Sequence, residues 1–137
     1  RSTPLYSSAA SDVYKRQHEL ISIYRSSECR WKENYPLTAQ VGFAANVFTR
    51  MRLCTNEGVL NLSFKGHPKH APLGLKPWYL LPTSSLRTET IIFGHWSDLG
   101  TLVTKNYIAI DGGCVWGNEL VGICLDNRKI FKVSCAK

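Results

Sequence analysis

Residues 90–96 read Thr-Ile-Ile-Phe-Gly-His-Trp, and residues 107–113 read Tyr-Ile-Ala-Ile-Asp-Gly-Gly. Both stretches begin with a continuous apolar run of strand length that stops abruptly at glycine or aspartate. Strands that end this way place their polar residues at the edge of a sheet, where functional sites tend to lie. Gly94 leaves room beside the backbone, so we expect the His95 imidazole to project from the strand end into a cleft.

Two further β signals follow toward the C-terminus. Residues 120–125 and 129–133 flank Asp126-Asn127, a pair of residues typical of tight hairpin turns. We therefore expect the C-terminal part of the chain to form a β-meander.

The segment before these strands has helical spacing. From residue 38 to residue 52 the apolar side chains recur about every 3.6 residues, with Thr38 as the expected N-cap. The face expected to be buried consists of Val41, Ala44, Ala45, Phe48 and Leu53. Residues 18–24 are expected to close an earlier helix, and residues 25–36 to form a loop anchored by Trp31.

A strand and a long loop are expected between this helix and the first apolar run. Residues 59–64 have strand composition and follow the turn sequence Thr55-Asn-Glu-Gly58. Residues 65–85 hold four of the six prolines, which predicts an irregular loop. Loops of that length in a compact domain are usually functional or disordered.

Composition limits the class of protein. A length of 137 residues fits one domain, and 44% hydrophobic and 20% charged residues with a mean hydropathy of -0.16 are typical of a globular chain. No window holds 18 consecutive apolar residues, which excludes a membrane-spanning helix. The N-terminus shows no charged start followed by an apolar stretch, so we expect no secretory signal and a cytoplasmic protein.

The cysteines and the charges are less specific. The five cysteines form no Cys-x-x-Cys pair, which favours buried reduced thiols over disulfides, and no base can be assigned to Cys114 as a nucleophile. Seventeen Lys and Arg against ten Asp and Glu give a net charge of +7, which favours a polyanionic partner such as nucleic acid, nucleotide or phosphate. The basic residues are scattered, so charge alone does not identify that partner.

The first seventeen residues are expected to lie outside the fold. Residues 7–17 read Ser-Ser-Ala-Ala-Ser-Asp-Val-Tyr-Lys-Arg-Gln and resemble the translated read-through of a transposase sequencing adapter; a native flexible lead is the alternative. Without residues 1–17 the chain has 14 basic and 9 acidic residues, a net charge of +5. This chain does not begin with methionine, and we therefore expect residues 18–137 to carry the fold as a fragment of a longer protein.

Histidines are the first candidates for chemistry. The neutral imidazole of His95 could bind zinc, manganese or iron or serve as a base, although an ordinary hydrogen-bonded histidine beside Trp96 is the plainer interpretation. His67 and His70 are three residues apart and could share a metal, but nothing nearby supplies a third strong ligand.

Cationic and aromatic side chains form the second group of candidates for chemistry. Arg50 and Arg52 carry the fork of donors that suits phosphate, but near a helix end they could equally pair with carboxylates. Lys76 stands two residues before Trp78, so that a cation and stacking rings could hold a base and its phosphate, or the aromatic residues could simply anchor the loop.

Four segments in this order resemble the C-terminal half of the bacterial symmetrical diadenosine tetraphosphatases, within the calcineurin-like metallophosphoesterase superfamily. They are Asn46-Val-Phe-Thr-Arg-Met-Arg-Leu-Cys54, Leu75-Lys-Pro-Trp78, Phe93-Gly-His-Trp96 and Ile110-Asp-Gly-Gly-Cys-Val-Trp-Gly117. The similarity runs from about residue 23 to residue 133. Gly112 stands where the family usually has threonine, and Asn118 where it usually has a second glycine, which affects the expected loop geometry.

The resemblance implies a hydrolase that splits diadenosine tetraphosphate in its middle to give two ADP. It implies an α/β sandwich of two sheets flanked by helices, of which this chain would be the C-terminal, mostly β part. It also implies a pair of divalent ions, manganese or cobalt, that activate a water. In family terms His95 matches a metal ligand, and the remaining site residues, which could hold substrate phosphates or adenine, are Arg50, Arg52, Lys76 and Trp78.

The sequence departs from the family by omission. The other ligand motifs, such as Gly-Asp-x-His-Gly and Gly-Asn-His-Asp, do not occur in this chain. One imidazole does not hold a catalytic ion, which needs at least about three protein ligands in hydrolytic zinc sites. We therefore predict that the chain alone is inactive, does not bind the metal pair stably, and exposes strand edges and apolar surface that favour aggregation.

Two other interpretations compete with a hydrolase. A basic nucleotide- or RNA-binding module without catalysis would show salt-sensitive affinity for nucleic acid, and a β-rich structural subunit would explain the strands. Neither explains four ordered motifs. The expected partner is therefore a dinucleoside polyphosphate substrate, with no membrane and no specific nucleic acid.

Overall fold

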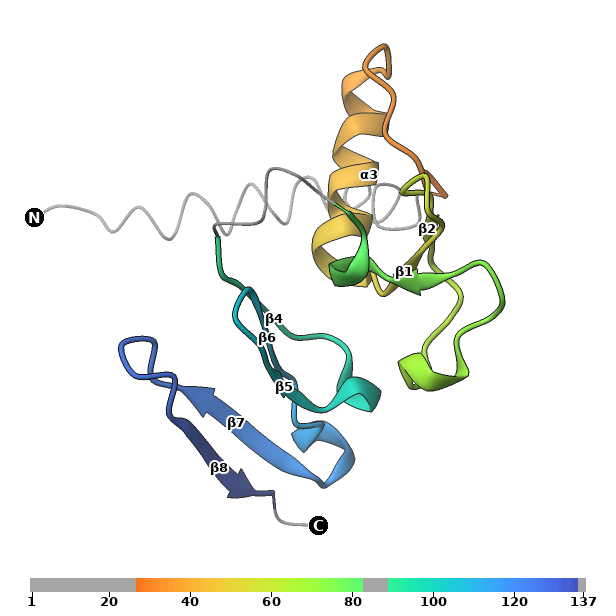
Figure 1. Ribbon diagram of the computed structural model, residues 1–137. Coiled ribbons are helices and arrows are strands. Elements are labelled where there is room, and N and C mark those ends of the chain that lie inside the picture. Colours follow the sequence, from red (N-terminus) through yellow and green to blue (C-terminus); the bar gives the residue numbers. More distant parts are fainter. Residues whose placement is uncertain (1–26, 83–88, 136–137) are drawn as a thin grey trace, which may run out of the picture. The chain divides into compact units, whose positions relative to one another are not determined.

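The structure is a computed structural model that describes residues 27–82 and 89–135. The chain divides into two compact units, residues 1–49 and 50–137. Within the described residues, one α-helix precedes eight short strands in an α/β arrangement (Figure 1). The helix end expected at residues 18–24 lies outside the described residues. No helix in the described part of the chain is long and apolar enough to cross a membrane.

The predicted helix is confirmed as α3, Leu37–Arg50, but its start differs from the expectation. The backbone N–H groups of Ala39 and Gln40 donate to the carbonyl of Pro36, at 2.9 and 3.0 Å. Thr38 therefore lies inside the first turn and is not the N-cap. The fixed φ of proline suits the start of a helix, which explains the earlier beginning.

The buried face of α3 also differs from the predicted one. Asn46 is completely buried, and its Nδ2 donates to the Glu28 carbonyl oxygen at 3.0 Å. This bond fastens the irregular segment of residues 27–36 to the helix, and Trp31 packs on Phe43 with ring centroids 5.7 Å apart. Phe48, which was expected to be buried, is 85% exposed. The loop interpretation is confirmed for residues 27–36, whereas Trp31, expected as the anchor of this loop, contacts Phe43 but is 48% exposed.

The first sheet of the second unit consists of very short strands. β1 (Leu53–Cys54), β2 (Leu60–Asn61) and β3 (Lys76–Pro77) are antiparallel in the order β2-β1-β3. Leu53 thus belongs to a strand rather than to the helix. β2 is shorter than the predicted strand because the Asn61 Oδ1 accepts from the backbone N–H groups of Ser63 and Phe64, which turns the chain.

The predicted loop after β2 is irregular but not without structure. It contains the 3₁₀ turns η1 (Pro68–His70) and η2 (Trp78–Leu80) on either side of β3. Pro77 is tolerated in β3 because that strand pairs on one side only.

The second sheet contains the two apolar runs of residues 90–93 and 107–110. β4 (Ile91–Phe93), β5 (Thr101–Val103) and β6 (Tyr107–Ile110) form a sheet in the order β4-β6-β5. β4 and β6 are parallel, with Phe93 opposite Ala109, whereas β5 and β6 are antiparallel. The expected β-meander is therefore wrong here. β6 takes the central position because its Ile108 and Ala109 are buried, at 1% and 2% exposure.

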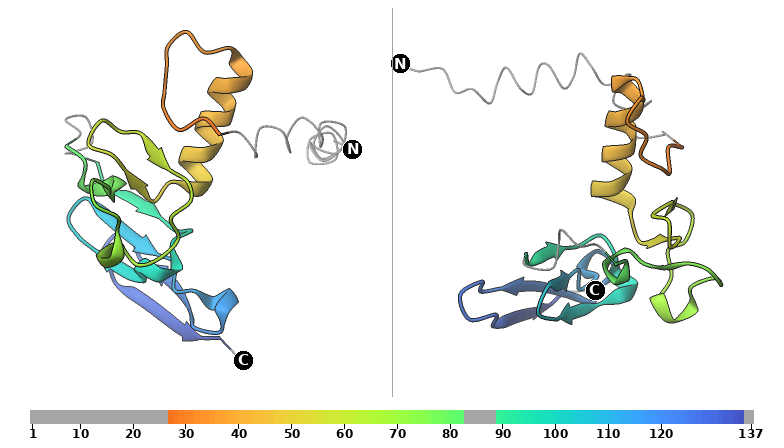
Figure 2. Two further views of the ribbon diagram at one scale, coloured as in Figure 1. Left: turned by 90° about the vertical axis from the view of Figure 1, so that its right-hand side faces the viewer. Right: turned by 45° about the horizontal axis from the view of Figure 1, so that its top comes forward.

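The last two strands form the predicted hairpin. β7 (Glu119–Ile123) pairs antiparallel with β8 (Ile130–Ser134), and the Cys124 N–H donates to the Lys129 carbonyl at 2.9 Å (Figure 2). The hairpin brings the end of β8 back to the loop before β7, where the Cys135 N–H donates to the Asn118 carbonyl at 2.8 Å.

The sequence favoured reduced thiols over disulfides, but two of the five cysteines are joined in the structure. Cys114 and Cys135 form a disulfide with their Cα atoms 5.5 Å apart, because the hairpin brings together two residues that are 21 positions apart in sequence. Cys29, Cys54 and Cys124 are free thiols. Cys54 is buried, and burial raises the pKa of its thiol to about 11.

An aromatic cluster joins η2 to the second sheet. The Trp78 ring meets the rings of Phe93 and Tyr107 edge-on, with centroids 5.0 and 5.7 Å apart, and Tyr79 contacts the same two rings. Aromatic pairs in this geometry stabilise a fold beyond the area that they bury. The turn η2, which follows β3, is therefore packed against β4 and β6 through these side chains.

Candidate functional site

His95 and Asp111 lie at the same edge of the second sheet. Because β4 and β6 are parallel and Phe93 is opposite Ala109, the two strands end at the same edge of the sheet. A Cβ placed on Gly94 would lie 3.9 Å from the Asp111 Cβ, which shows how closely the two strand ends approach. The expectation that these polar residues lie at a sheet edge is confirmed. The sequence did not show that the two strands are parallel neighbours.

His95 has an unusual backbone conformation for a non-glycine residue. Its φ is 61°, in the left-handed region, and the residue is exposed. A residue with a Cβ in this region is strained by roughly 1–2 kcal/mol and persists only where its surroundings hold it. Trp96, which follows His95, supplies one such hold: it is 2% exposed and its Nε1 donates to the Gly66 carbonyl at 2.9 Å.

Arg52 supplies the second hold on His95. Its Nη2 donates to the His95 carbonyl oxygen at 2.9 Å, so the guanidinium contacts the backbone of His95 rather than its imidazole. The Nε of the same guanidinium is buried and has no hydrogen-bond partner among the described residues. Desolvation lowers the pKa of Arg52, and nearby Arg50 adds to this, whereas Asp98 and Asp111 raise it.

The pKa of the His95 imidazole is lowered, which favours its neutral form. Burial lowers its pKa below the ordinary value, the positive charge of Arg52 lowers it further, and Asp111 opposes both effects. A neutral imidazole has a lone pair for a metal ion or a proton. The electrostatic coupling places Arg52, His95 and Asp111 within one cluster of charges.

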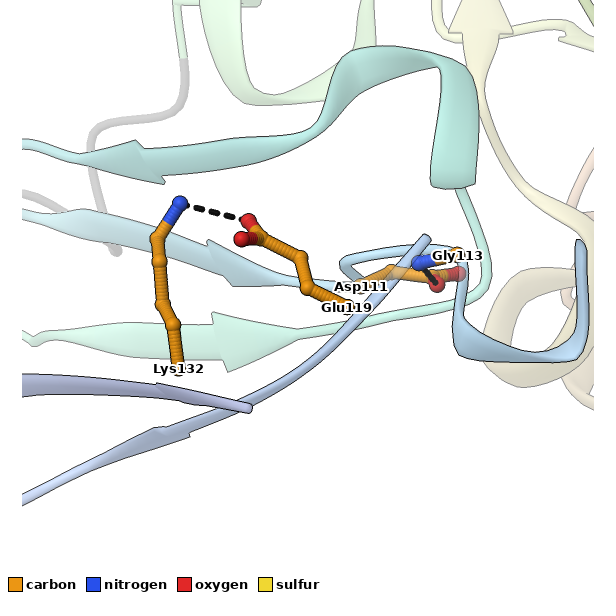
Figure 3. A network of polar contacts seen from close by, with 4 residues as sticks. All are labelled: Asp111, Gly113, Glu119 and Lys132. Carbon is orange, nitrogen blue, oxygen red and sulfur yellow. Dashed lines mark hydrogen bonds and ion pairs between the residues drawn. The ribbon is translucent and has the colours of Figure 1, made fainter. Parts of the chain in front are cut away.

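The Asp111 carboxylate accepts a hydrogen bond from the loop that follows it. Asp111 Oδ1 accepts from the Gly113 backbone N–H at 3.1 Å, and an ion pair joins Lys132 to Glu119 farther along the hairpin (Figure 3). Gly113 has φ 73°, in the left-handed region. A Cβ on Gly112 would clash with the Glu119 carbonyl oxygen and lie 2.6 Å from Val121 Cγ2. The backbone at position 112 therefore leaves no room for a side chain.

The other predicted site residues lie on neighbouring elements. Arg50 ends α3 and is close enough to Arg52 to lower its pKa. Lys76 is exposed in β3, opposite Cys54 of β1. The half-buried Trp78 has its ring in the aromatic cluster, so it anchors the loop; a role in stacking on adenine stays a prediction.

The described residues do not fit a metal ion by themselves. Within residues 27–82 and 89–135, no group of three or more His, Cys, Asp and Glu side chains could hold one. His95 and Asp111 supply two donor side chains at one edge, which is fewer than a hydrolytic metal site requires. His67 and His70 have ring centroids 6.3 Å apart and belong to no such group.

Sequence reasoning missed two carboxylates of this cluster. Asp98, in η4 (Ser97–Leu99), and Asp111 both act on Arg52, although neither was proposed as a site residue. The abrupt end of the Tyr107–Ile110 run at Asp111 was the available signal. Asp98 gave none, because its proximity to Arg52 arises only from the tertiary fold.

Comparison with known proteins gives a consistent set of relatives. The chain is 37% identical over 117 residues to a protein of Dechloromonas aromatica, 40% identical over 116 residues to one of Nitrosomonas europaea, and 36% identical over 118 residues to one of Bordetella pertussis. All three are named "Bis(5'-nucleosyl)-tetraphosphatase, symmetrical". The alignments cover 85–86% of this chain, which spans only 42–43% of the length of these relatives. No family model matches the chain.

Proposed function

We propose that this chain, which is 36–40% identical over about 85% of its length to relatives named as symmetrical bis(5'-nucleosyl)-tetraphosphatases, is part of a hydrolase of dinucleoside polyphosphates. The proposed reaction is the cleavage of diadenosine tetraphosphate between its second and third phosphates. Water supplies a hydroxyl to one phosphorus and a proton to the oxygen that leaves, so the products are two ADP. The observation that carries this proposal is the 36–40% identity to relatives that bear one name.

The proposed fold is part of a metallophosphoesterase sandwich. The combination of an α-helix with short β-sheets supports this assignment, with residues 18–137 as the proposed homologous part and residues 1–17 outside it. The aligned lengths of 116–118 residues are compatible with that boundary. In this proposal the remaining strands of the sandwich belong to polypeptide that is not in this sequence.

The proposed role of His95 is that of one metal ligand among several. Its position at a sheet edge with Asp111 nearby supports this role, and its lowered pKa favours the imidazole form that can bind a metal ion. The bound ions, manganese or cobalt, would neutralise charge on the phosphates. Because the family's other ligand motifs do not occur in this sequence, we propose that the other ligands come from polypeptide outside this chain, and the chain alone is predicted to be inactive.

The proposed role of Arg52 is to donate to a phosphate oxygen. Its Nε is buried and has no acceptor among residues 27–82 and 89–135, and leaving a buried donor unpaired costs about 1–3 kcal/mol. A phosphate oxygen would satisfy this donor, and a guanidinium–phosphate hydrogen bond is among the stronger kinds in proteins. Arg50, Lys76 and Trp78 are proposed as further substrate contacts.

A chimera tests the proposed function. The homologous part of the Nitrosomonas europaea relative is replaced by this chain, and the products formed from diadenosine tetraphosphate with manganese or cobalt are separated by chromatography. We expect ADP as the sole nucleotide product, its formation abolished by His95→Ala and unchanged by the exposed-site control Lys105→Gln. Formation of ATP with AMP, or no turnover by a folded chimera beside an active parent relative, would refute the proposal.

A further inference from the structure

The segment between β2 and β3, light green in Figure 1, carries positive charge without negative charge. No Asp or Glu occurs from residue 58 to residue 88. The basic side chains of the segment of residues 65–76, which we call the basic loop, are Lys65, His67, Lys69, His70 and Lys76. Such a concentration of one sign of charge attracts anions.

Both ends of the basic loop are fastened to the candidate site. At its start, Trp96 Nε1 donates to the Gly66 carbonyl at 2.9 Å, and Trp96 directly follows His95. At its end, the Trp78 N–H donates to the Arg52 carbonyl at 3.0 Å, and Arg52 in turn donates to the His95 carbonyl. Hydrogen bonds therefore attach the start of the basic loop to the residue after His95, and the residues just after its end to Arg52.

The basic loop also has a defined local structure. The His67 side chain caps η1, because its Nδ1 accepts from the Lys69 N–H at 3.0 Å. Further along, the Leu75 N–H donates to the Pro72 carbonyl at 3.1 Å. The proline residues reduce the number of backbone conformations available to the unbound loop. An anion that binds here would consequently pay little conformational entropy to order it.

The lysines of the basic loop are exposed and carry charge that no described carboxylate balances. Lys65, Lys69 and Lys76 are exposed, and none of them forms an ion pair with another described residue. The charge of Arg52, in contrast, is already partly offset by Asp98 and Asp111. A chain of four phosphates therefore needs more cations than Arg52 supplies.

We propose that the basic loop binds the polyphosphate chain of the substrate as it extends from the site at His95 and Arg52. This inference rests on the proposed function and adds to it a segment that recognises the polyphosphate itself. The ligand class is a linear polyphosphate, free or esterified to nucleosides, bound through the ammonium groups of three exposed lysines.

Titration calorimetry with inorganic tripolyphosphate tests the proposal on the full 137-residue chain without divalent metal. The triple variant Lys65→Gln/Lys69→Gln/Lys76→Gln removes the three ammonium groups, and Lys32→Gln/Lys105→Gln/Lys129→Gln is the matched control with the same change in net charge. We expect the loop variant to bind at least about tenfold more weakly, and the control to stay within about twofold of the parent chain. Amide NMR spectra of the three proteins verify that they share one fold.

Three outcomes would overturn the inference: equal weakening by both triple variants, no binding of tripolyphosphate by the parent chain, or tighter binding of a short RNA than of tripolyphosphate through the same lysines. In the active chimera, the loop variant is expected to raise KM for diadenosine tetraphosphate and leave kcat within about twofold. If the chimera is active and the triple loop variant changes neither its KM nor the affinity for tripolyphosphate, this inference alone is overturned. An inactive chimera with loop-dependent tripolyphosphate binding overturns the proposed function instead.

Discussion

The disulfide between Cys114 and Cys135 is expected to hold the C-terminal hairpin in place. The double variant Cys114→Ser/Cys135→Ser, or reduction by a dithiol, opens a loop between residues 21 positions apart that contains η5 (Cys114–Trp116) and both strands of the hairpin. In the chain-entropy account, closing a loop of this length stabilises the folded state by about 3 kcal/mol.

The hairpin has little other burial to rely on. Leu120, Phe131 and Val133 are more than half exposed, and Val121 is the one strand residue of the hairpin that is buried. Fully burying one valine contributes roughly 1.5–3 kcal/mol. The disulfide thus contributes about as much as the buried core of the hairpin, so its loss is expected to let β7 and β8 open locally.

Amide hydrogen exchange measures this opening strand by strand. In the oxidised chain the paired amides of β7 and β8 are protected, and in the double variant their protection is expected to fall about 100-fold, as 3 kcal/mol implies. The amides of Ile108 and Ala109 in β6 serve as an internal reference and are expected to change little. Cys124→Ser, which removes a free thiol from the same hairpin, is the matched control.

Unchanged protection in the double variant would refute this reasoning. A thiol count tests the bond itself: the denatured, unreduced chain is expected to titrate three thiols, those of Cys29, Cys54 and Cys124. Five thiols before reduction would show that the pair is not joined. Native-state alkylation is expected to spare Cys54, because burial raises the pKa of its thiol to about 11.

Four further predictions concern the site and its surroundings. Trp96→Phe removes the hydrogen bond to the Gly66 carbonyl and is expected to cost about 1–3 kcal/mol in urea unfolding; a loss below about 0.5 kcal/mol would contradict a structural role for that bond. Gly112→Thr is expected to lower the melting temperature, because the added Cβ overpacks a crowded site by about 1–3 kcal/mol, and a higher melting temperature would contradict the crowding. Because the folded-state pKa of His95 is lowered, its contribution to stability is present at neutral pH and is lost as the pH falls below the ordinary histidine pKa of about 6.5. Asp111→Asn is expected to lower the pKa of His95 further in an NMR titration, and a rise would show that Asp111 does not act on it.

Much of the local structure could be predicted from sequence. The apolar runs before Gly94 and Asp111 became β4 and β6, and the Asp126-Asn127 turn became the hairpin between β7 and β8. Each of these features depends on neighbouring residues, whose periodicity and turn chemistry act over a few positions. The α-helix was predicted for the same reason, although Pro36 moved its start.

The pairing of distant segments was not predictable in this way. Nothing in the runs themselves states that β4 and β6 are parallel neighbours, because partner choice depends on which faces pack together after the intervening chain has folded. The same holds for the hydrogen bond from Arg52 to the His95 carbonyl and for the disulfide, which join residues 43 and 21 positions apart. The sequence alone determined that His95 and Asp111 end strands; the tertiary structure decided that they meet, and that Arg52 holds the backbone beside them.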